Sequence, residues 1–207
     1  GDAWSMPGMY YSPSKGFYDT ARAPGTYGRT IMPLIRYAQV VGNTEALKLA
    51  EHYSKGVLYV SDSYRFDQFG NFKGFGDESP HVHSVAATVA GLILLGTELR
   101  RKDLVEQGRA IYEYGLKLIG TEFGWLVESN PNTPSNRARP MLRQTTCEGC
   151  CITDFIECAI YLAHAGYPEH WAEAERYIRN HLFEHQMTTV SWVTSKGSVD
   201  MRPRILG

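Results

Sequence analysis

The feature that most constrains the fold is an internal repeat of amphipathic segments. The second halves of three segments align without gaps and share the pattern large, small, large, large at one spacing: Leu47, Ala50, Tyr53 and Leu58, then Val105, Gly108, Ile111 and Leu116, then Trp171, Ala174, Tyr177 and Leu182. A small residue between large ones at helical spacing is typical of helices that pack closely side by side. The repeat therefore predicts stacked helical units.

Each unit is interpreted as a pair of helices. The first half of the first unit carries the i, i+3, i+4, i+7 stripe of an amphipathic helix, at Ile31, Leu34, Ile35 and Ala38. Gly42 and Asn43 then predict a turn, and a second helix is expected from about Thr44. We predict an all-α fold for residues 1–207, a single domain or a fragment of one, with few short strands and with antiparallel helical hairpins at about 27–60, 83–120 and 147–187.

Helical repeats of this kind form either open solenoids or closed (α/α) toroids. The loops at about 61–82 and 121–145 are long and contain many aromatic residues, and loops of that length usually carry function. They favour the toroid, because a solenoid keeps its connections short. A closed ring of six hairpins needs roughly twice this length of chain. We therefore predict an incomplete toroid: the chain is a fragment, has lost hairpins, or is completed by another chain in a homo-oligomer.

The composition argues against two classes of partner. The net charge is -1 and the Lys and Arg residues are scattered, so no nucleic-acid surface is expected. The longest apolar run, around "VAGLILLG", is too short to span a membrane. The sequence begins with Gly rather than Met, so removal of a leader stays open, and both the bacterial cytoplasm and a periplasmic or secreted location are compatible with it.

All four cysteines lie in the stretch "RQTTCEGCCITDFIEC" at the start of the third unit. Helical spacing places five side chains on one face there: Cys147, Cys150, Cys151, Asp154 and Cys158. Adjacent cysteines on a helix have poor geometry for a disulfide. Cys147, Cys150 and Cys151, with Glu148 or a loop histidine, could hold zinc. The alternative is that they pack as small apolar residues, which is the expectation for Cys158. Asp154 would either support such a site or belong to it.

Two histidines stand at the expected start of the second unit. His81 and His83 flank Val82, and Ser79 is a candidate helix cap. Histidine is the side chain most easily tuned as an acid, a base or a ligand near neutral pH. The pair therefore indicates substrate contacts, and the alternative is a capped helix start with solvated polar side chains.

The loop before the third unit adds carboxylates and an aromatic pair. Glu122 and Glu128 bracket Phe123 and Trp125, and a carboxyl group against an indole in a dry pocket can serve as a general acid. Aromatic faces also stack on sugars, although packing of the loop onto the core would use the same residues. Three arginines that could hold a substrate carboxylate or hydroxyl group follow: Arg137, Arg139 and Arg143.

These motifs resemble the six-hairpin (α/α) toroid glycoside hydrolases, and more closely the β-L-arabinofuranosidase group of glycoside hydrolase family 127 and its uncharacterised bacterial relatives. The resemblance rests on "HVHSVAATVAGL", "FGWLVE" and "CEGCCITD…AGYPEHWAEAERYIRNHLFEHQ", and covers roughly residues 25–190. It implies a zinc ion held by a Glu-x-Cys pair and two further cysteines, with a zinc-bound thiolate as the nucleophile. Glu148-Gly149-Cys150 matches that pair. The second cysteine pair of the family has no counterpart here, and Cys147 and Cys151 stand beside the first motif instead.

We therefore expect a glycoside hydrolase-like protein that acts on or binds a sugar derived from a plant or bacterial polysaccharide. The expected catalytic residues are Glu128 as general acid, with Cys150 and Asp154. The expected substrate contacts are His81, His83, Trp125 and Arg143. The candidate zinc ligands are Glu148, Cys147, Cys150 and Cys151. The alternatives are a non-catalytic helical module that binds a saccharide or a protein, and a lyase or epimerase on the same toroid.

Overall fold

The computed structural model describes residues 9–12, 16–19, 24–77, 79, 81–134 and 148–185, and within these parts the predicted all-α fold of antiparallel hairpins is confirmed. The first hairpin consists of η1 (Pro24–Gly28), α1 (Arg29–Val41), α2 (Thr44–Lys55) and η2 (Gly56–Val60). The second consists of α3 (Val82–Glu98), α4 (Lys102–Ile111), η3 (Tyr112–Leu116) and η4 (Lys117–Ile119). The third consists of α6 (Gly149–His164), α7 (His170–Tyr177), η6 (Ile178–Leu182) and η7 (Phe183–His185). Closure into a ring stays a prediction.

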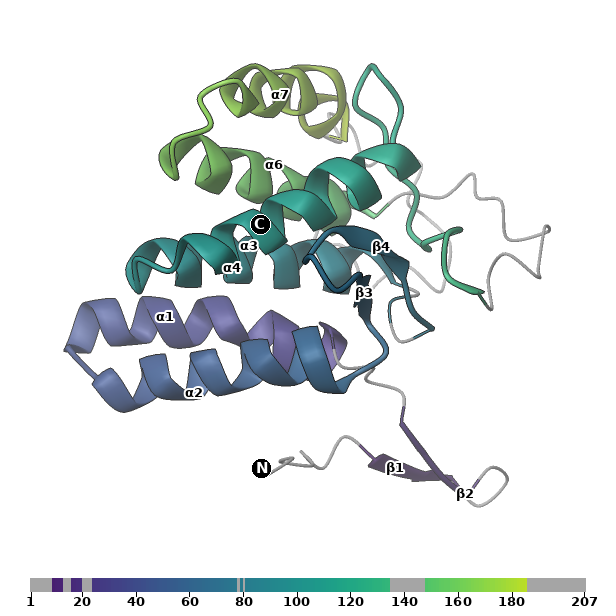
Figure 1. Cartoon of the computed structure of the whole chain (residues 1–207). Helices are drawn as coiled ribbons and strands as arrows, with labels where there is room; N and C mark the ends of the chain where they lie inside the picture. The colour runs from purple at the N-terminus through teal and green to yellow at the C-terminus, as the bar shows by residue number, and fades with distance from the viewer. Residues whose placement is uncertain are drawn as a thin grey trace, which may run out of the picture.

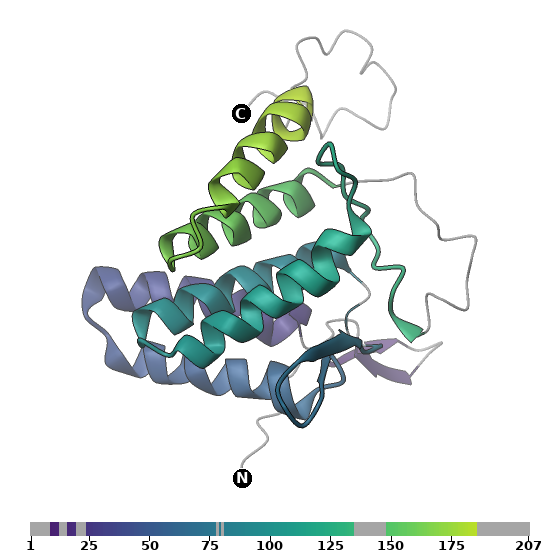
Figure 2. The same ribbon diagram turned by 45° about the horizontal axis from the view of Figure 1, so that its top comes forward.

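The first helices of the hairpins form an inner row, in which α3 lies between α1 and α6 (Figures 1 and 2). The second helices α2, α4 and α7 each pack against the first helix of their own hairpin. The central α3 is covered on nearly every side, since 14 of its 17 residues are buried. A helix that is apolar all round must lie inside the protein, so the run "VAGLILLG" is the core of the stack.

The turn of the first hairpin lies where the sequence predicts it. Gly42 adopts the left-handed conformation with φ 72°, and its N–H donates to the carbonyl of Ala38 (2.8 Å). A residue with a Cβ atom is disfavoured in this conformation, whereas Gly readily ends a helix in it. The side chain of Asn43 then accepts hydrogen bonds from the N–H groups of Glu45 and Ala46, which caps α2.

The small residue of the repeat lets the second helix approach the first. A Cβ atom built on Gly108 of α4 would lie 2.7 Å from Cγ1 of Ile93 in α3, closer than atoms can pack. The equivalent residues Ala50 and Ala174 are also buried, at 0% and 3% exposure. The small residue of the pattern thus follows from the close packing of the two helices in each hairpin.

A π-helical turn explains the last interval of the repeat. Ile111 and Leu116 are five residues apart, and on an α-helix such side chains would point about 140° away from each other. Both are nevertheless completely buried. In η3 the N–H of Lys117 donates to the carbonyl of Tyr112, five residues earlier, and η2 and η6 close in the same way. The wider turn brings both residues of the interval onto the buried face.

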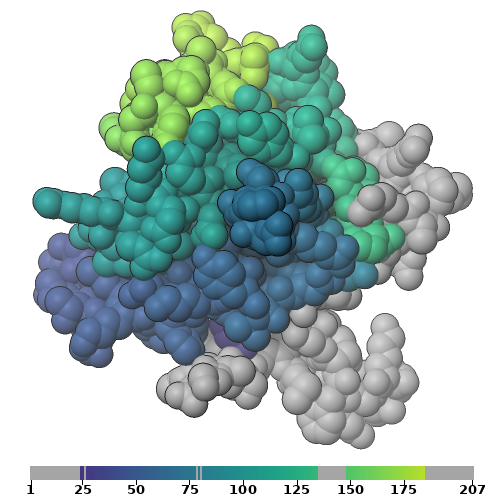
Figure 3. Space-filling model, in the orientation of Figure 1, coloured from purple at the N-terminus to yellow at the C-terminus, as the bar shows by residue number. Residues whose placement is uncertain are grey.

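Two small antiparallel hairpins of strands accompany the helices. β1 (Met9–Ser12) pairs with β2 (Gly16–Asp19), and β3 (Tyr64–Phe66) pairs with β4 (Phe72–Phe75), with a register shift after Arg65. The stretch at 125–127 forms only an isolated bridge, between Gly120 and Leu126. The β3–β4 hairpin packs on α4 and η3 and stands out on the face drawn in Figure 3.

In the part of the chain that the structure covers, no helix combines the length and the apolar character needed to cross a bilayer.

Candidate functional site

The candidate site lies where the inner helices begin. Within each hairpin the short turn is at one end, so α1, α3 and α6 all start at the other end, toward the right of Figure 1. The loop that follows the second hairpin returns to the start of α3: the carbonyl of Glu128 accepts a hydrogen bond from the N–H of Val82 (2.9 Å), and His81 and Ser129 form an isolated β-bridge. Because of this pairing, Glu128 stands beside His81, far from it in sequence.

His81 connects the second and third hairpins. Its Nε2 donates to Oε2 of Glu148 (2.9 Å), and its Nδ1 is 3.1 Å from the hydroxyl oxygen of Ser84. Glu128 completes a group with them: one ligand atom each of His81, Glu128 and Glu148 lies within 4.8 Å of the other two. Two carboxylates from different loops therefore converge on one imidazole.

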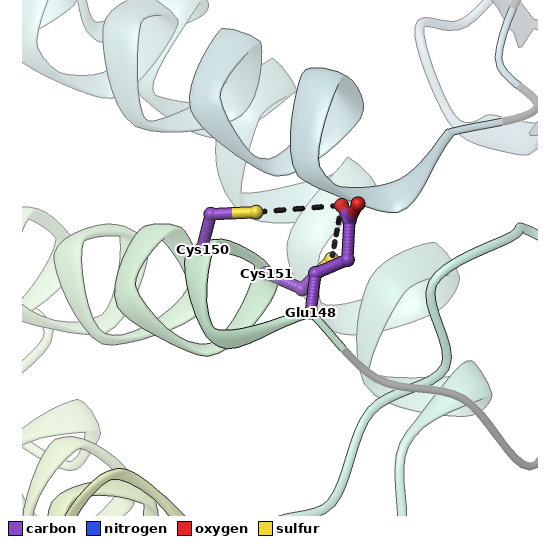
Figure 4. Close-up of side chains that lie close together, drawn as sticks. All are labelled: Glu148, Cys150 and Cys151. Carbon is purple, nitrogen blue, oxygen red and sulfur yellow. Dashed lines mark hydrogen bonds between the residues drawn. The ribbon is translucent and has the colours of Figure 1, made fainter. Parts of the chain in front are cut away.

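The carboxylate of Glu148 also faces two thiols (Figure 4). Glu148 is the residue before α6, yet its side chain makes no capping hydrogen bond. It accepts instead from the Sγ of Cys150 at 3.4 Å, and the Sγ of Cys151 lies at 4.0 Å. Neither Cys150 nor Cys151 is in a disulfide; the first is half-buried and the second is fully buried. The start of α6 thus presents one carboxylate and two sulfur atoms to the same point.

Hydrogen bonding and burial set the protonation states of this group in opposite directions. The hydrogen bond from His81 lowers the pKa of Glu148, against the effect of burial, and the Cys150 thiol lowers it further. Burial and the nearby Glu148 carboxylate raise the pKa of Cys150 to about 11. At neutral pH the protein alone therefore holds an ionised carboxylate next to a protonated thiol.

Deeper in the site, the half-buried His83 and the buried Asp154 form a pair through Nδ1 and Oδ2. Burial is the main cause that raises the pKa of Asp154 to about 8, and Glu157 one turn later adds to it. Burial also lowers the pKa of His83, with contributions from Arg29 and His81. Both shifts disfavour charge, so we conclude that the pair holds a single proton at neutral pH.

The third cysteine that the structure describes is a packing residue, as expected. Cys158 is completely buried, and its Sγ donates to the carbonyl of Ala86 in α3 (3.3 Å). Burial raises its pKa well above the usual value. Cys158 therefore helps α6 lie close to α3 and takes no part in the polar group. Cys147 falls outside the described residues.

The donor set fits a metal ion. Glu148, Cys150 and Cys151 offer one carboxylate oxygen and two sulfur atoms within 4.8 Å of one another, and the group of His81, Glu128 and Glu148 shares Glu148 with them. Thiolates, imidazole and carboxylate are the ligands of zinc, and three protein donors with an open position are typical of its catalytic sites. The structure thus contains groups of residues that could hold such an ion.

Several residues expected in the site are not joined to it. The backbone of Trp125 pairs with Thr121, and among the described residues no hydrogen bond or ring contact links its indole to the His81–Glu148 group. Glu122 is exposed, so it is not the carboxyl group in a dry pocket that the sequence suggests. Three arginines of the preceding loop fall outside the described residues: Arg137, Arg139 and Arg143.

The expected cap of α3 is wrong. Ser79 is completely buried, and its hydroxyl donates to the carbonyl of Ser63 (2.8 Å) rather than to the helix. The side-chain amide of Asn130 donates to the carbonyl of Ser79 (3.1 Å). Ser79 therefore joins the loops on either side of the second hairpin. Its role is to hold the loop that carries Glu128 against the start of α3.

Three neighbours of the site are not predicted by the sequence analysis. Arg29, the first residue of α1, lies close enough to influence the pKa values of both His83 and Asp154. Ser84 contacts the imidazole of His81. Glu157 follows Asp154 by one helical turn, and this spacing is the only hint that the sequence offers.

Comparisons with known proteins assign no family. No protein-family model matches the chain, and no curated protein matches it significantly.

Proposed function

We propose that the protein is a glycoside hydrolase that acts on a sugar from a plant or bacterial polysaccharide. The observation that carries the proposal is the approach of two carboxylates, Glu128 and Glu148, to within 4.8 Å of each other and of His81. Hydrolysis of a glycosidic bond needs a general acid and a second group that acts as a base or a nucleophile. The cluster offers Glu128 for the first role, and it places a carboxylate and the Cys150 thiol nearby for the second. The resemblance to the β-L-arabinofuranosidase group supports the same activity.

The roles that we propose follow from the positions and contacts of the side chains. Glu128 is the general acid, because Glu148 is held ionised by His81 and has no proton to give. His81 and His83 bind sugar hydroxyl groups, while Asp154 holds His83 in place through their hydrogen bond. Cys150 is the nucleophile, next to the carboxylate that accepts from its thiol.

Zinc is the cofactor that we propose for this site. Glu148, Cys150 and Cys151 would hold it. His81 and Glu128, which lie close to Glu148, are further candidate ligands. A bound cation of this charge lowers the pKa of a coordinating thiol and so supplies the thiolate that nucleophilic attack needs.

A saccharide-binding module without catalytic activity is the second candidate. The observation that favours it is the pKa of about 11 for the Cys150 thiol, because a protonated thiol is a poor nucleophile. A carboxylate, imidazole and thiol cluster would then serve only to bind hydroxyl groups.

Aryl glycosides distinguish the two candidates. We expect zinc-loaded protein to release the aryl group from at least one glycoside, with an arabinofuranoside tested first. Loss of a general acid typically costs 10²–10⁴-fold in rate, so Glu128→Gln should reduce turnover by about that factor. Glu122→Gln is the matched control, since Glu122 is an exposed carboxylate of the same loop.

The hydrolase proposal fails if Glu128→Gln and Cys150→Ser both leave turnover of every cleaved glycoside unchanged. It also fails if no glycoside is cleaved while calorimetry detects a bound oligosaccharide, and that result would support the binding module. Elemental analysis of the purified protein for zinc tests the cofactor separately.

A further inference from the structure

A buried histidine on the outer helices lacks a partner for one of its nitrogens. His170, the first residue of α7, is only 1% exposed. Its Nδ1 is 2.7 Å from Oε2 of Glu173, whereas its Nε2 has no hydrogen-bond partner among the described residues. Oε1 of Glu113 is 3.3 Å from that Nε2, but not in the direction of a hydrogen bond. A buried nitrogen of this kind costs free energy unless something else satisfies it.

We propose that His170, Glu113 and Glu169 form a second site, for a divalent transition-metal ion such as Zn²⁺. One ligand atom of each lies within 4.8 Å of the other two. For metal–ligand bonds of about 2.1 Å, ligand atoms in a tetrahedral site are about 3.4 Å apart. The distance of 3.3 Å between Nε2 of His170 and Oε1 of Glu113 matches this separation between two ligand atoms. A small rotation of Glu169, which is exposed, would bring its carboxylate to the third position.

The hydrogen bonds around His170 select the tautomer that a metal requires. An ionised carboxylate only accepts, so Nδ1 carries the hydrogen and the lone pair of the neutral imidazole is on Nε2. In a neutral imidazole that lone pair would lie beside the carboxylate of Glu113, a repulsive arrangement that an intervening cation would relieve. Histidine ligands in metal sites commonly donate their other N–H to a carboxylate in this way.

Glu173, the carboxylate behind His170, is itself held in place. It accepts hydrogen bonds from the hydroxyl of Tyr112 (3.1 Å) and from the ammonium of Lys117. The ring of Tyr112 also meets that of His170 edge to face, with centroids 5.5 Å apart. The imidazole is therefore fixed by two contacts before any ion binds, as expected of a preformed ligand.

The charges of the site suit a dication. Glu113 and Glu169 carry two negative charges and His170 is neutral as a ligand, so Zn²⁺ would give a neutral centre. Arg109 competes for Glu113, with Nη1 3.4 Å from Oε1, but the same guanidinium has shorter contacts to Glu106 (2.9 Å). Arg109 can therefore keep a carboxylate partner when Glu113 turns to the metal.

Such an ion would join two hairpins. Glu113 belongs to η3 of the second hairpin, whereas Glu169 and His170 open α7 of the third. Metal binding to the folded state alone raises the folding equilibrium constant by a factor of about 100 when the free ion is at 100 times its dissociation constant. We therefore expect Zn²⁺ to raise the thermal midpoint, in addition to any effect at the candidate active site.

Calorimetric titration with Zn²⁺ tests the site if the other cluster is first removed. The full chain carrying Glu148→Gln and Cys150→Ser loses ligands of both metal groups at the start of α6. We expect it to retain one equivalent of Zn²⁺. Adding Glu169→Gln, an exposed change that leaves the core intact, should weaken that binding at least tenfold. With Co²⁺ as the probe, this equivalent should show no sulfur-to-cobalt charge-transfer band.

Glu175→Gln is the matched control. It removes the same charge from α7, but Glu175 is exposed and pairs only with Arg179 among the ion pairs of the described residues. We expect it to leave Zn²⁺ affinity unchanged. The proposal is overturned if the Glu148→Gln/Cys150→Ser protein binds no Zn²⁺, or if Glu169→Gln and Glu175→Gln have equal effects. Turnover of glycosides by Glu169→Gln in the otherwise wild-type chain should be unaffected, which separates this site from the proposed activity.

Discussion

Replacing Asp154 with Asn should abolish a loss of stability that the wild-type protein shows as the pH rises from 6.5 to 8. In the unfolded chain Asp154 ionises near 3.8 and His83 loses its proton near 6.5, so the two together bind one proton between these values and none above them. In the folded protein burial raises the pKa of Asp154 to about 8 and lowers that of His83, so the pair holds its one proton up to about pH 8.

The magnitude follows from the difference in bound protons. Below pH 6.5, down to the lowered pKa of His83, the folded and unfolded pairs bind one proton each, so the pair gives no pH dependence in that interval. Between pH 6.5 and about 8 the folded state binds one proton more, and stability falls as the pH rises. Over about 1.5 pH units, at about 1.36 kcal/mol each, the loss is about 2 kcal/mol.

Urea unfolding followed by tryptophan fluorescence, with a chelator present, measures this loss at the two pH values. Asp154→Asn cannot bind the proton, so the difference in unfolding free energy between variant and wild type should change by about 2 kcal/mol in favour of the variant. Taking this difference cancels the contribution of two other thiols, the half-buried Cys150 and the buried Cys158, whose raised pKa values also destabilise the fold at high pH.

A second variant keeps the test sharp. His83→Gln leaves Asp154 as the only titrating member of the pair, so the fall in stability should begin at a lower pH, near the 3.8 of a free aspartate. The conclusion that the pair shares one proton is wrong in either of two cases. The first is that Asp154→Asn keeps the wild-type decrease in unfolding free energy, and the second is that His83→Gln does not widen the pH range of that decrease.

Three further changes test the fold. Asn43→Ala removes the cap of α2 and should lower the unfolding free energy by about 1 kcal/mol in urea, while Asn43→Asp, which can still cap, should not; equal losses would contradict the capping role. Gly28→Ala places a Cβ atom 1.8 Å from Oγ1 of Thr88, and this overpacking should cost about 1–3 kcal/mol and lower the thermal midpoint; an unchanged midpoint would refute the packing. Although burial opposes it, the hydrogen bonds from His170 and Lys117 lower the pKa of Glu173 from 4.5 to about 2, so its ionised form contributes about 3 kcal/mol above pH 4.5 that is lost as the pH falls toward 2. Glu173→Gln should remove this loss of stability at acid pH. If the variant loses as much unfolding free energy as the wild type when the pH falls toward 2, Glu173 does not have this role.

The hairpins were predictable because their signal is local. The apolar stripe of α1 and the Gly42–Asn43 turn lie within a few residues of one another, and the burial of one helix face requires such a pattern. The π-helical turns were not predictable in the same way. Their only trace is the interval of five between residues such as Ile111 and Leu116, which has no meaning until both are seen to be buried.

The residues of the candidate site were also predictable only where their signal is local. The side chains near the start of α6 could be selected by residue type and spacing, since Glu148, Cys150 and Asp154 share one short stretch. Their partners could not, because His81 meets Glu148 and His83 meets Asp154 only through the packing of α3 against α6. That registration depends on side-chain volumes along both helices, such as Ala86 opposite Cys158. No spacing within one helix encodes it.

The burial of α3 has a consequence for synthesis of the protein. Its covering helix α6 ends at His164, whereas α3 ends at Glu98, 66 residues earlier. At a typical elongation rate of about 5–20 residues per second, α6 is completed roughly 3–13 s after α3. During this interval, of the three helices that pack most extensively on α3, only α1 and α4 have been synthesised. The apolar face of α3 that α6 will cover is therefore exposed to chaperones and to other nascent chains until the third hairpin emerges.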